Sequence, residues 1–232
     1  MSAAPKVIRT KNFVADAAGF VLKQIRNAIA ERNEFRIALS GGNTPAPVYA
    51  RVAADSHGFP WERVLFTFGD ERCVLPDDPQ SNFRMARENL FVPAAVPEKS
   101  IIRMRGEIDP RTAAQEYEDQ LDAIATEHGE PIYQHDLILL GLGDDGHTAS
   151  LFPGTAALEE GARRVVANFV PKLNAWRLTF TFPLINHAGH ILFLVGASKS
   201  PQLIERVLAG DQQFPAARVN PAAGEVTWMI GE

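Results

Sequence analysis

The sequence lacks the features of secreted and membrane-bound proteins. Cys73 is the single cysteine among 232 residues, so no disulfide can form within the chain, as is usual in a reducing compartment. The longest apolar run, Ile191 to Ala197, is about seven residues, whereas a membrane-spanning helix needs roughly 20. The opening segment MSAAPKVIRT also lacks the apolar core of a signal peptide. We therefore expect a cytoplasmic protein that has no membrane partner.

Basic residues are not in excess either. Lys and Arg total 23 against 28 Asp and Glu, a net charge of -5, which indicates no nucleic-acid partner. The 17 glycines and 16 prolines follow no period, which excludes a fibrous chain. With 46% hydrophobic and 22% charged residues, the composition is that of an ordinary globular protein. No composition break divides the chain, and we predict one domain over residues 1–232.

Short apolar segments alternate with amphipathic ones along the chain. The apolar segments predict strands at residues 35–39, 64–68, 136–140, 176–182, 191–195 and 226–230. The amphipathic segments predict helices at residues 13–32, 44–53, 81–90, 109–128 and 198–208, the second of them capped by Thr44 with Pro45 in its first turn. This alternation predicts an α/β fold, with a Rossmann-like, mostly parallel sheet covered by helices on both faces.

Four polar loops follow predicted strands. They comprise residues 40–45, 70–72, 141–150 and 197–199. Parallel sheets bind their ligands in the loops at the carboxyl ends of the strands. The sequence therefore predicts that these four loops converge on one site.

The first of these loops joins a strand to the start of a helix. Its residues are Ser40, Gly41, Gly42, Asn43 and Thr44. The glycines allow the backbone to turn tightly with its N–H groups aimed at one point, and the helix start adds a positive dipole end. The loop therefore fits an anion, most often phosphate, although a plain tight turn remains the alternative.

The third loop contains Gly-x-Gly-x-x-Gly over residues 141–146, the pattern of a dinucleotide site. Asp144 and Asp145 stand where a pyrophosphate would lie, and Pro153 interrupts the helix that should follow. We therefore expect no nicotinamide or flavin cofactor. The same loop ends in His147, which suits a general base whose tautomer a neighbouring carboxylate fixes. A structural histidine is the alternative, and because the histidines show no zinc-site spacing we expect no metal.

The remaining two loops carry cations. Arg72 offers a planar fork for a phosphate or carboxylate, and Asp70 either binds a sugar hydroxyl or pairs with Arg72. Lys199 stands at the start of its predicted helix, where the dipole disfavours a cation and an anionic ligand would resolve the conflict. We interpret Cys73 as a small buried residue rather than a nucleophile.

Taken together, these loops resemble those of a known family. In order, the segments are LSGGNTP, GDERCVLPDDPQSNF, LILLGLGDDGHTASLFPG and RLTFTFPLINHAGHILFLVGASKS, which span about residues 37–200. They resemble the 6-phosphogluconolactonases, which share a fold with glucosamine-6-phosphate deaminase and use no cofactor. The resemblance implies hydrolysis of 6-phospho-D-glucono-1,5-lactone to 6-phospho-D-gluconate in the oxidative pentose phosphate pathway.

Two other functions remain open on this fold. The sister deaminase has a glutamate five residues after the histidine and usually Asp-Glu-Tyr, whereas this chain has Phe152 and Arg72 at those positions. Both departures favour the lactonase over a deaminase or isomerase. A non-catalytic sugar-phosphate sensor is the other alternative, against which the complete His147 loop argues.

The resemblance also implies residue roles. His147 deprotonates the attacking water and Asp145 orients it. The Ser40–Asn43 loop binds the phosphate together with Arg72 and Lys199, and Asp70 binds a sugar hydroxyl. Arg72 and loop N–H groups are both candidates to stabilise the oxyanion. The expected partner is a small sugar-phosphate lactone, and the protein is expected to be a monomer or a small homo-oligomer.

Overall fold

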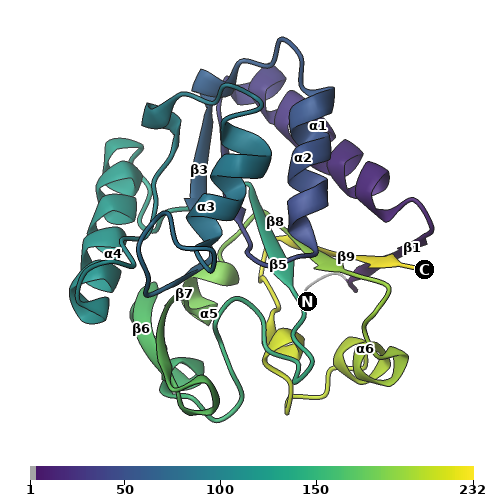
Figure 1. Cartoon of the computed structure of the whole chain (residues 1–232), viewed down its shortest axis with the longest axis vertical. Helices are drawn as coiled ribbons and strands as arrows, with labels where there is room; N and C mark the ends of the chain where they lie inside the picture. The colour runs from purple at the N-terminus through teal and green to yellow at the C-terminus, as the bar shows by residue number, and fades with distance from the viewer. Residues whose placement is uncertain (1–3) are drawn as a thin grey trace.

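A computed structural model describes residues 4–232 and is built around a six-stranded sheet (Figure 1). All the strand pairs of this main sheet are parallel, in the order β1-β9-β8-β5-β2-β3. Its strands are β1 (Lys6–Thr10), β2 (Phe35–Leu39), β3 (Val64–Phe68), β5 (Leu137–Gly141), β8 (His190–Val195) and β9 (Glu225–Gly231). The predicted parallel α/β sheet is therefore confirmed, with β1 as an edge strand that periodicity did not predict.

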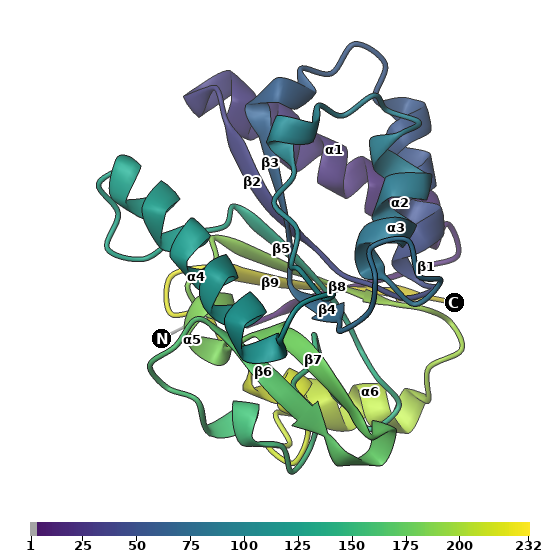
Figure 2. The same ribbon diagram turned by 60° about the vertical axis from the view of Figure 1, so that its left-hand side comes forward.

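The main sheet is buried on both faces. Its strands are therefore continuous apolar runs in the sequence, because the side chains on both faces of the sheet pack in a core. In β5, Leu137 and Leu139 face one core and Ile138 and Leu140 face the other. The first core includes residues of α1 (Phe13–Arg32), α2 (Pro45–Asp55) and α3 (Asn82–Ala86). The second includes residues of α4 (Pro110–Glu127), α5 (Phe182–Ile185) and α6 (Pro201–Leu208). Figure 2 shows the two groups on opposite sides of the sheet.

A second, smaller sheet shares the face covered by α4 and α6. It is antiparallel, in the order β4-β7-β6, with strands β4 (Asp70–Arg72), β6 (Val165–Val170) and β7 (Ala175–Phe180). The strand predicted at residues 176–182 therefore lies outside the parallel sheet, and residues 70–72, predicted as a loop, form β4. Three residues are too few to show a hydrophobic period, so the sequence pattern could not reveal this strand.

Two predicted helix starts are also corrected. Thr44 has helical backbone angles (φ -70°, ψ -45°) and its side chain makes no capping hydrogen bond, so it does not cap α2. Helix α6 begins at Pro201, and Ser200 caps it by accepting a hydrogen bond from the backbone N–H of Leu203 at 3.4 Å. Lys199 therefore lies in the loop before the helix. No helix within residues 4–232 is long and apolar enough to span a bilayer.

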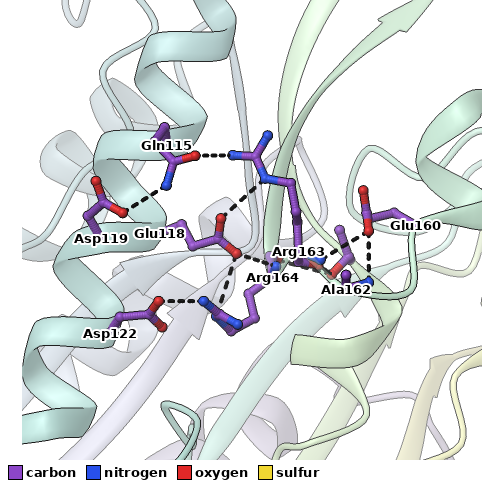
Figure 3. Close-up of polar contacts among 9 residues, drawn as sticks. Gln115, Glu118, Asp119, Asp122, Glu160, Ala162, Arg163 and Arg164 are labelled. Atoms are coloured by element: carbon purple, nitrogen blue, oxygen red, sulfur yellow. Dashed lines mark hydrogen bonds and ion pairs between the residues drawn. The ribbon is translucent and has the colours of Figure 1, made fainter.

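Polar contacts attach the second sheet to α4 (Figure 3). The buried Glu118 carboxylate accepts hydrogen bonds from the backbone N–H of Arg164 at 2.5 Å and from Arg163 Nε at 3.3 Å. The Arg164 guanidinium also donates to Asp122, and the Arg163 guanidinium to Gln115 Oε1 at 2.8 Å. These contacts hold the two residues that precede β6 against α4.

Candidate active site

The four predicted loops converge at the carboxyl edge of the main sheet. They line one cavity of about 520 Å³, together with residues of β7 and of the turn between β6 and β7. Every site residue predicted from the sequence except Asp145 lines this cavity: Ser40, Gly41, Gly42, Asn43, Thr44, Asp70, Arg72, His147 and Lys199. Asp145 contacts it through His147. The predicted convergence of the loops is confirmed.

His147 is held by a carboxylate on its own loop. Its Nδ1 lies 2.5 Å from Asp145 Oδ1, and its backbone N–H donates to the same oxygen at 3.2 Å. Burial alone would raise the pKa of Asp145, but hydrogen bonds from Lys172 and His147 hold this pKa at about 2. Because an ionised carboxylate only accepts hydrogen bonds, Nδ1 of His147 carries a proton, and in the neutral imidazole Nε2 is then the nitrogen with the free lone pair.

Phe152 completes the setting of this histidine. The two rings stack with their centroids 4.0 Å apart and their planes 25° from parallel. Gly143 also packs against the imidazole. A Cβ at this position would lie 2.0 Å from His147 Nδ1, so only glycine fits there. In the Gly-x-Gly-x-x-Gly pattern, Gly143 thus makes room for the imidazole and Gly146 for the Phe214 side chain, and residues 147–155 form no helix.

The loop after β2 presents unpaired donors to the cavity. The Ser40 hydroxyl is buried and has no hydrogen-bond partner within residues 4–232, nor have the backbone N–H groups of Gly41, Gly42 and Asn43. Gly42 has φ +99°, a left-handed conformation that favours glycine. The Ser40 backbone N–H is already satisfied by Tyr49 Oη at 2.9 Å, so the hydroxyl, not this N–H, is the donor that Ser40 has free.

Two arginines face each other across the second sheet. Arg72 and Arg177 are directly paired residues of β4 and β7, and both line the cavity. Arg72 donates to the Gln80 carbonyl and Arg177 to the Trp176 carbonyl at 3.1 Å. In the described part of the chain neither forms an ion pair with a carboxylate. Burial, and then the nearby Arg72 charge, lower the pKa of Arg177. An anion bound beside the two cations would relieve this repulsion.

Asp70 does not pair with Arg72, so the ion-pair alternative is wrong. Its carboxylate accepts from Ser150 Oγ at 2.6 Å and from Asn82 Nδ2 at 3.2 Å. Asn168 Nδ2 in turn donates to the Ser150 carbonyl at 2.9 Å. The next residue, Glu71, is buried and accepts from the backbone N–H groups of Asn82 and Phe83. Asp70 therefore joins the His147 loop to the second sheet.

Lys199 reaches the cavity from the loop after β8. Its Nζ donates to Asp144 Oδ1 at 2.5 Å, and this hydrogen bond lowers the pKa of Asp144. Asp144 is 94% exposed whereas the Lys199 side chain is 19% exposed. An ion pair with so exposed a carboxylate contributes little, which leaves Lys199 available to an anion in the cavity.

Sequence reasoning missed two cations of the site, Lys172 and Arg177. Arg177 opens the last of the family-like segments quoted above, and Lys172 precedes it by five residues in a turn with no hydrophobic pattern. Burial raises the pKa of the Cys73 thiol to about 11, as for an unreactive thiol. No group of three or more metal-binding side chains occurs within residues 4–232.

Comparison with known proteins agrees with this geometry. A family model described as glucosamine-6-phosphate isomerases/6-phosphogluconolactonase matches residues 9–228. The chain belongs to this family. A family member named 6-phosphogluconolactonase from Synechocystis sp. is 45% identical over 216 residues, which cover 91% of this chain and 88% of that protein. One from Nostoc sp. is 36% identical over 94% of this chain and 90% of its own length.

Solved structures of this glucosamine-6-phosphate isomerase/6-phosphogluconolactonase family share the whole fold. The crystal structure of 6-phosphogluconolactonase from Thermotoga maritima has a TM-score of 0.87 at 26% identity and covers 98% of this chain and 100% of its own. That of the Trypanosoma brucei enzyme has a TM-score of 0.86 at 26% identity and covers 100% of this chain and 97% of its own. The small antiparallel sheet is thus part of the family fold rather than an addition to it.

Proposed function

We propose that this protein is a 6-phosphogluconolactonase, a hydrolase of carbohydrate metabolism that converts 6-phospho-D-glucono-1,5-lactone to 6-phospho-D-gluconate in the oxidative pentose phosphate pathway. The observation that carries the proposal is the pairing of His147 with ionised Asp145 at the rim of a cavity rich in cations and unpaired donors. The names of the relatives point to the same reaction.

His147 is the general base in this reaction. Its Nε2 takes a proton from water as the oxygen attacks the lactone carbonyl carbon. The bond from that carbon to the ring oxygen then breaks, and the imidazolium returns the proton to the departing ring oxygen. Asp145 holds the Nδ1–H tautomer throughout and stabilises the transient imidazolium, since it lies 2.5 Å from Nδ1.

The phosphate binds where the unpaired donors gather. Ser40, residues 41–43, Lys199 and Arg177 all line the cavity, so the Ser40 hydroxyl, the loop N–H groups and two cations are available to the phosphate. Arg72 lines the same cavity and suits either the phosphate or the oxyanion of the tetrahedral intermediate. Asp70 has acceptor capacity left for a sugar hydroxyl, beside its bonds to Ser150 and Asn82.

No step of this mechanism needs a cofactor or a metal. The residues that deprotonate water and bind the anion are all side chains or backbone groups of the chain. We propose a cytoplasmic enzyme that acts as a single domain, alone or as a small homo-oligomer, with the phosphorylated lactone as its only required partner.

A rate measurement tests the proposal. The protein should accelerate hydrolysis of 6-phospho-D-glucono-1,5-lactone well above the spontaneous rate, measured in the same buffer without enzyme. It should release no ammonia from glucosamine 6-phosphate, because Phe152 replaces the glutamate that the deaminases use. Ammonia release without lactone hydrolysis would assign the protein to the sister activity, and binding without either reaction would indicate a sensor.

A further inference from the structure

Lys172 lies outside the main sheet but contacts the catalytic pair. It stands in the turn Pro171–Leu173 between β6 and β7. Its ammonium group donates to Asp145 Oδ2, while the other oxygen of that carboxylate accepts from His147. The carboxylate is therefore held from both sides, by the base on one sheet and by a cation from the other.

The same lysine also contacts Phe152. Its Nζ lies 4.7 Å from the centroid of the ring that stacks on His147. Lys172, Asp145, His147 and Phe152 thus form a closed circuit of four side chains. A cation over an aromatic face adds to the attraction of the ion pair, so two contacts favour one position of a side chain that is 51% exposed.

The turn that carries Lys172 is short and defined. Val170 pairs with Ala175 at the end of the hairpin, and the Asn174 N–H donates to the Pro171 carbonyl at 3.0 Å. Asn174 adopts φ 46° and ψ 44°, a left-handed conformation that asparagine tolerates better than most residues. The backbone thus determines where the lysine stem begins.

We infer that Lys172 is a positioning residue for the lactonase reaction, acting on His147 through Asp145; this inference rests on the proposed function. The lysine holds the carboxylate in the rotamer that keeps the proton on His147 Nδ1. Its positive charge also lies beside the carboxylate that the imidazole contacts.

Other charged groups around His147 are already engaged or more distant from Asp145. Lys199 pairs with Asp144, Arg72 donates to the Gln80 carbonyl and Arg177 to the Trp176 carbonyl. Asp70 is buried against Ser150 and Asn82. Lys172 instead contacts Asp145, the carboxylate that holds His147. This contact separates its role from that of the cations proposed to bind the phosphate.

Three variants test this role, each measured on the phosphorylated lactone and on unphosphorylated glucono-1,5-lactone. Lys172→Met should lower kcat about 2- to 5-fold on both, the size of a partly exposed ion pair. The acid limb of the pH–rate profile should move up by about half a pH unit, as for one charge removed through a water-like dielectric. Lys172→Arg should restore most of the rate, and Lys172→Met should add no loss to Asp145→Asn.

A matched control separates positioning from phosphate binding. Lys199→Met removes a cation of the same cavity and should affect only the phosphorylated lactone. If Lys172→Met behaved like Lys199→Met, with an unmoved acid limb, Lys172 would be a phosphate ligand and the inference wrong. An unchanged rate and profile would reduce it to a surface lysine.

Imidazole nitrogen NMR gives a readout that does not depend on turnover. The wild-type spectrum should show His147 with its proton on Nδ1, and Lys172→Met should shift its protonation to higher pH. If the wild-type protein showed no lactonase activity, the proposed function would be wrong. If His147 titrated identically in the wild type and in Lys172→Met, only the role of Lys172 would be wrong.

Discussion

The two sheets contribute different chemistry to one site. The main sheet delivers the base and the anion loop through glycine-containing turns at the ends of β2 and β5, and a helix start follows the turn after β2. The small sheet delivers side-chain cations, Arg72, Lys172 and Arg177, from paired strands and their turn. The base and the cations around it therefore come from two different sheets, and the geometry of the site depends on how these sheets are positioned relative to each other.

Polar contacts join the two parts beside the apolar core that they share. Ser150 links them below the site, since its hydroxyl donates to Asp70 and its backbone N–H donates to Thr179 Oγ1 at 3.1 Å. Glu118 links the small sheet to α4 on the far side. Changes at these joints should therefore disturb the cations before they disturb the base.

The largest effect is expected at the main-sheet base. His147→Ala should fold normally and lose about 10²–10⁴ in kcat, the usual contribution of a general base. The loss should be the same for the phosphorylated and unphosphorylated lactones, because the chemistry is common to both. Steady-state kinetics against the spontaneous rate decide it, and activity within a few-fold of wild type would contradict the assignment.

The joint to α4 should cost stability. Glu118→Ala leaves the Arg164 N–H and two arginines without their buried acceptor, and we expect a loss of about 2–3 kcal/mol in the free energy of unfolding. Urea denaturation measures it. Asp122→Asn, which removes only a partly exposed partner of Arg164, should cost less than about 1 kcal/mol. Equal losses in the two variants would show that the burial of Glu118 has no special weight.

Lys199 should matter only for the phosphate. Lys199→Ala should lower kcat/KM for the phosphorylated lactone about 10- to 150-fold, the effect of losing a hydrogen bond to a charged group of about 1.5–3 kcal/mol. Slow hydrolysis of unphosphorylated gluconolactone should barely change. Comparable losses on both substrates would place Lys199 in the chemistry or in stability instead.

The last effect appears only as the pH falls and concerns a histidine between the two parts. His135 is fully buried, with Nε2 2.9 Å from Thr67 Oγ1 of β3 and its ring 5.2 Å from that of Phe180 of β7. Burial, and then the charges of Arg36 and His187, lower its pKa from 6.5 to about 3. The unfolded chain therefore binds this proton first, and stability falls by up to about 1.4 kcal/mol per pH unit between about pH 6.5 and 3.

Urea unfolding at several pH values tests this dependence. His135→Gln should be less stable at neutral pH but should lose less stability between pH 6.5 and 5 than the wild type. His57→Gln, at an exposed position, should keep the wild-type slope. A slope unaffected by His135→Gln would assign the acid sensitivity to other groups.

The main sheet could be predicted from the sequence far better than the small sheet. Parallel strands such as β5 are apolar on both faces, and their helices show clear periods, so the main sheet and its loops could be found. Strand β4 has three polar residues and β6 follows a turn-rich segment, so neither had a period to detect. For the same reason Lys172 and Arg177 were not predicted as site residues. Pairing of β7 with β4 brings Arg177 to the site, and the β6–β7 turn brings Lys172, and neither arrangement is encoded in a local pattern.

The hairpin of β6 and β7 connects the contact with α4 at one end to the active site at the other. It is anchored where Arg164 meets Glu118 and where the Thr181 N–H donates to the Arg164 carbonyl at 3.0 Å, and Lys172 rides at the other end. Six residues of strand span about 20 Å, so a tilt of about 3° at the anchor moves the tip by about 1 Å. A displacement of about 1 Å is enough to misalign a catalytic group. The position of Lys172 against Asp145 thus depends on how firmly the opposite end of the hairpin is held.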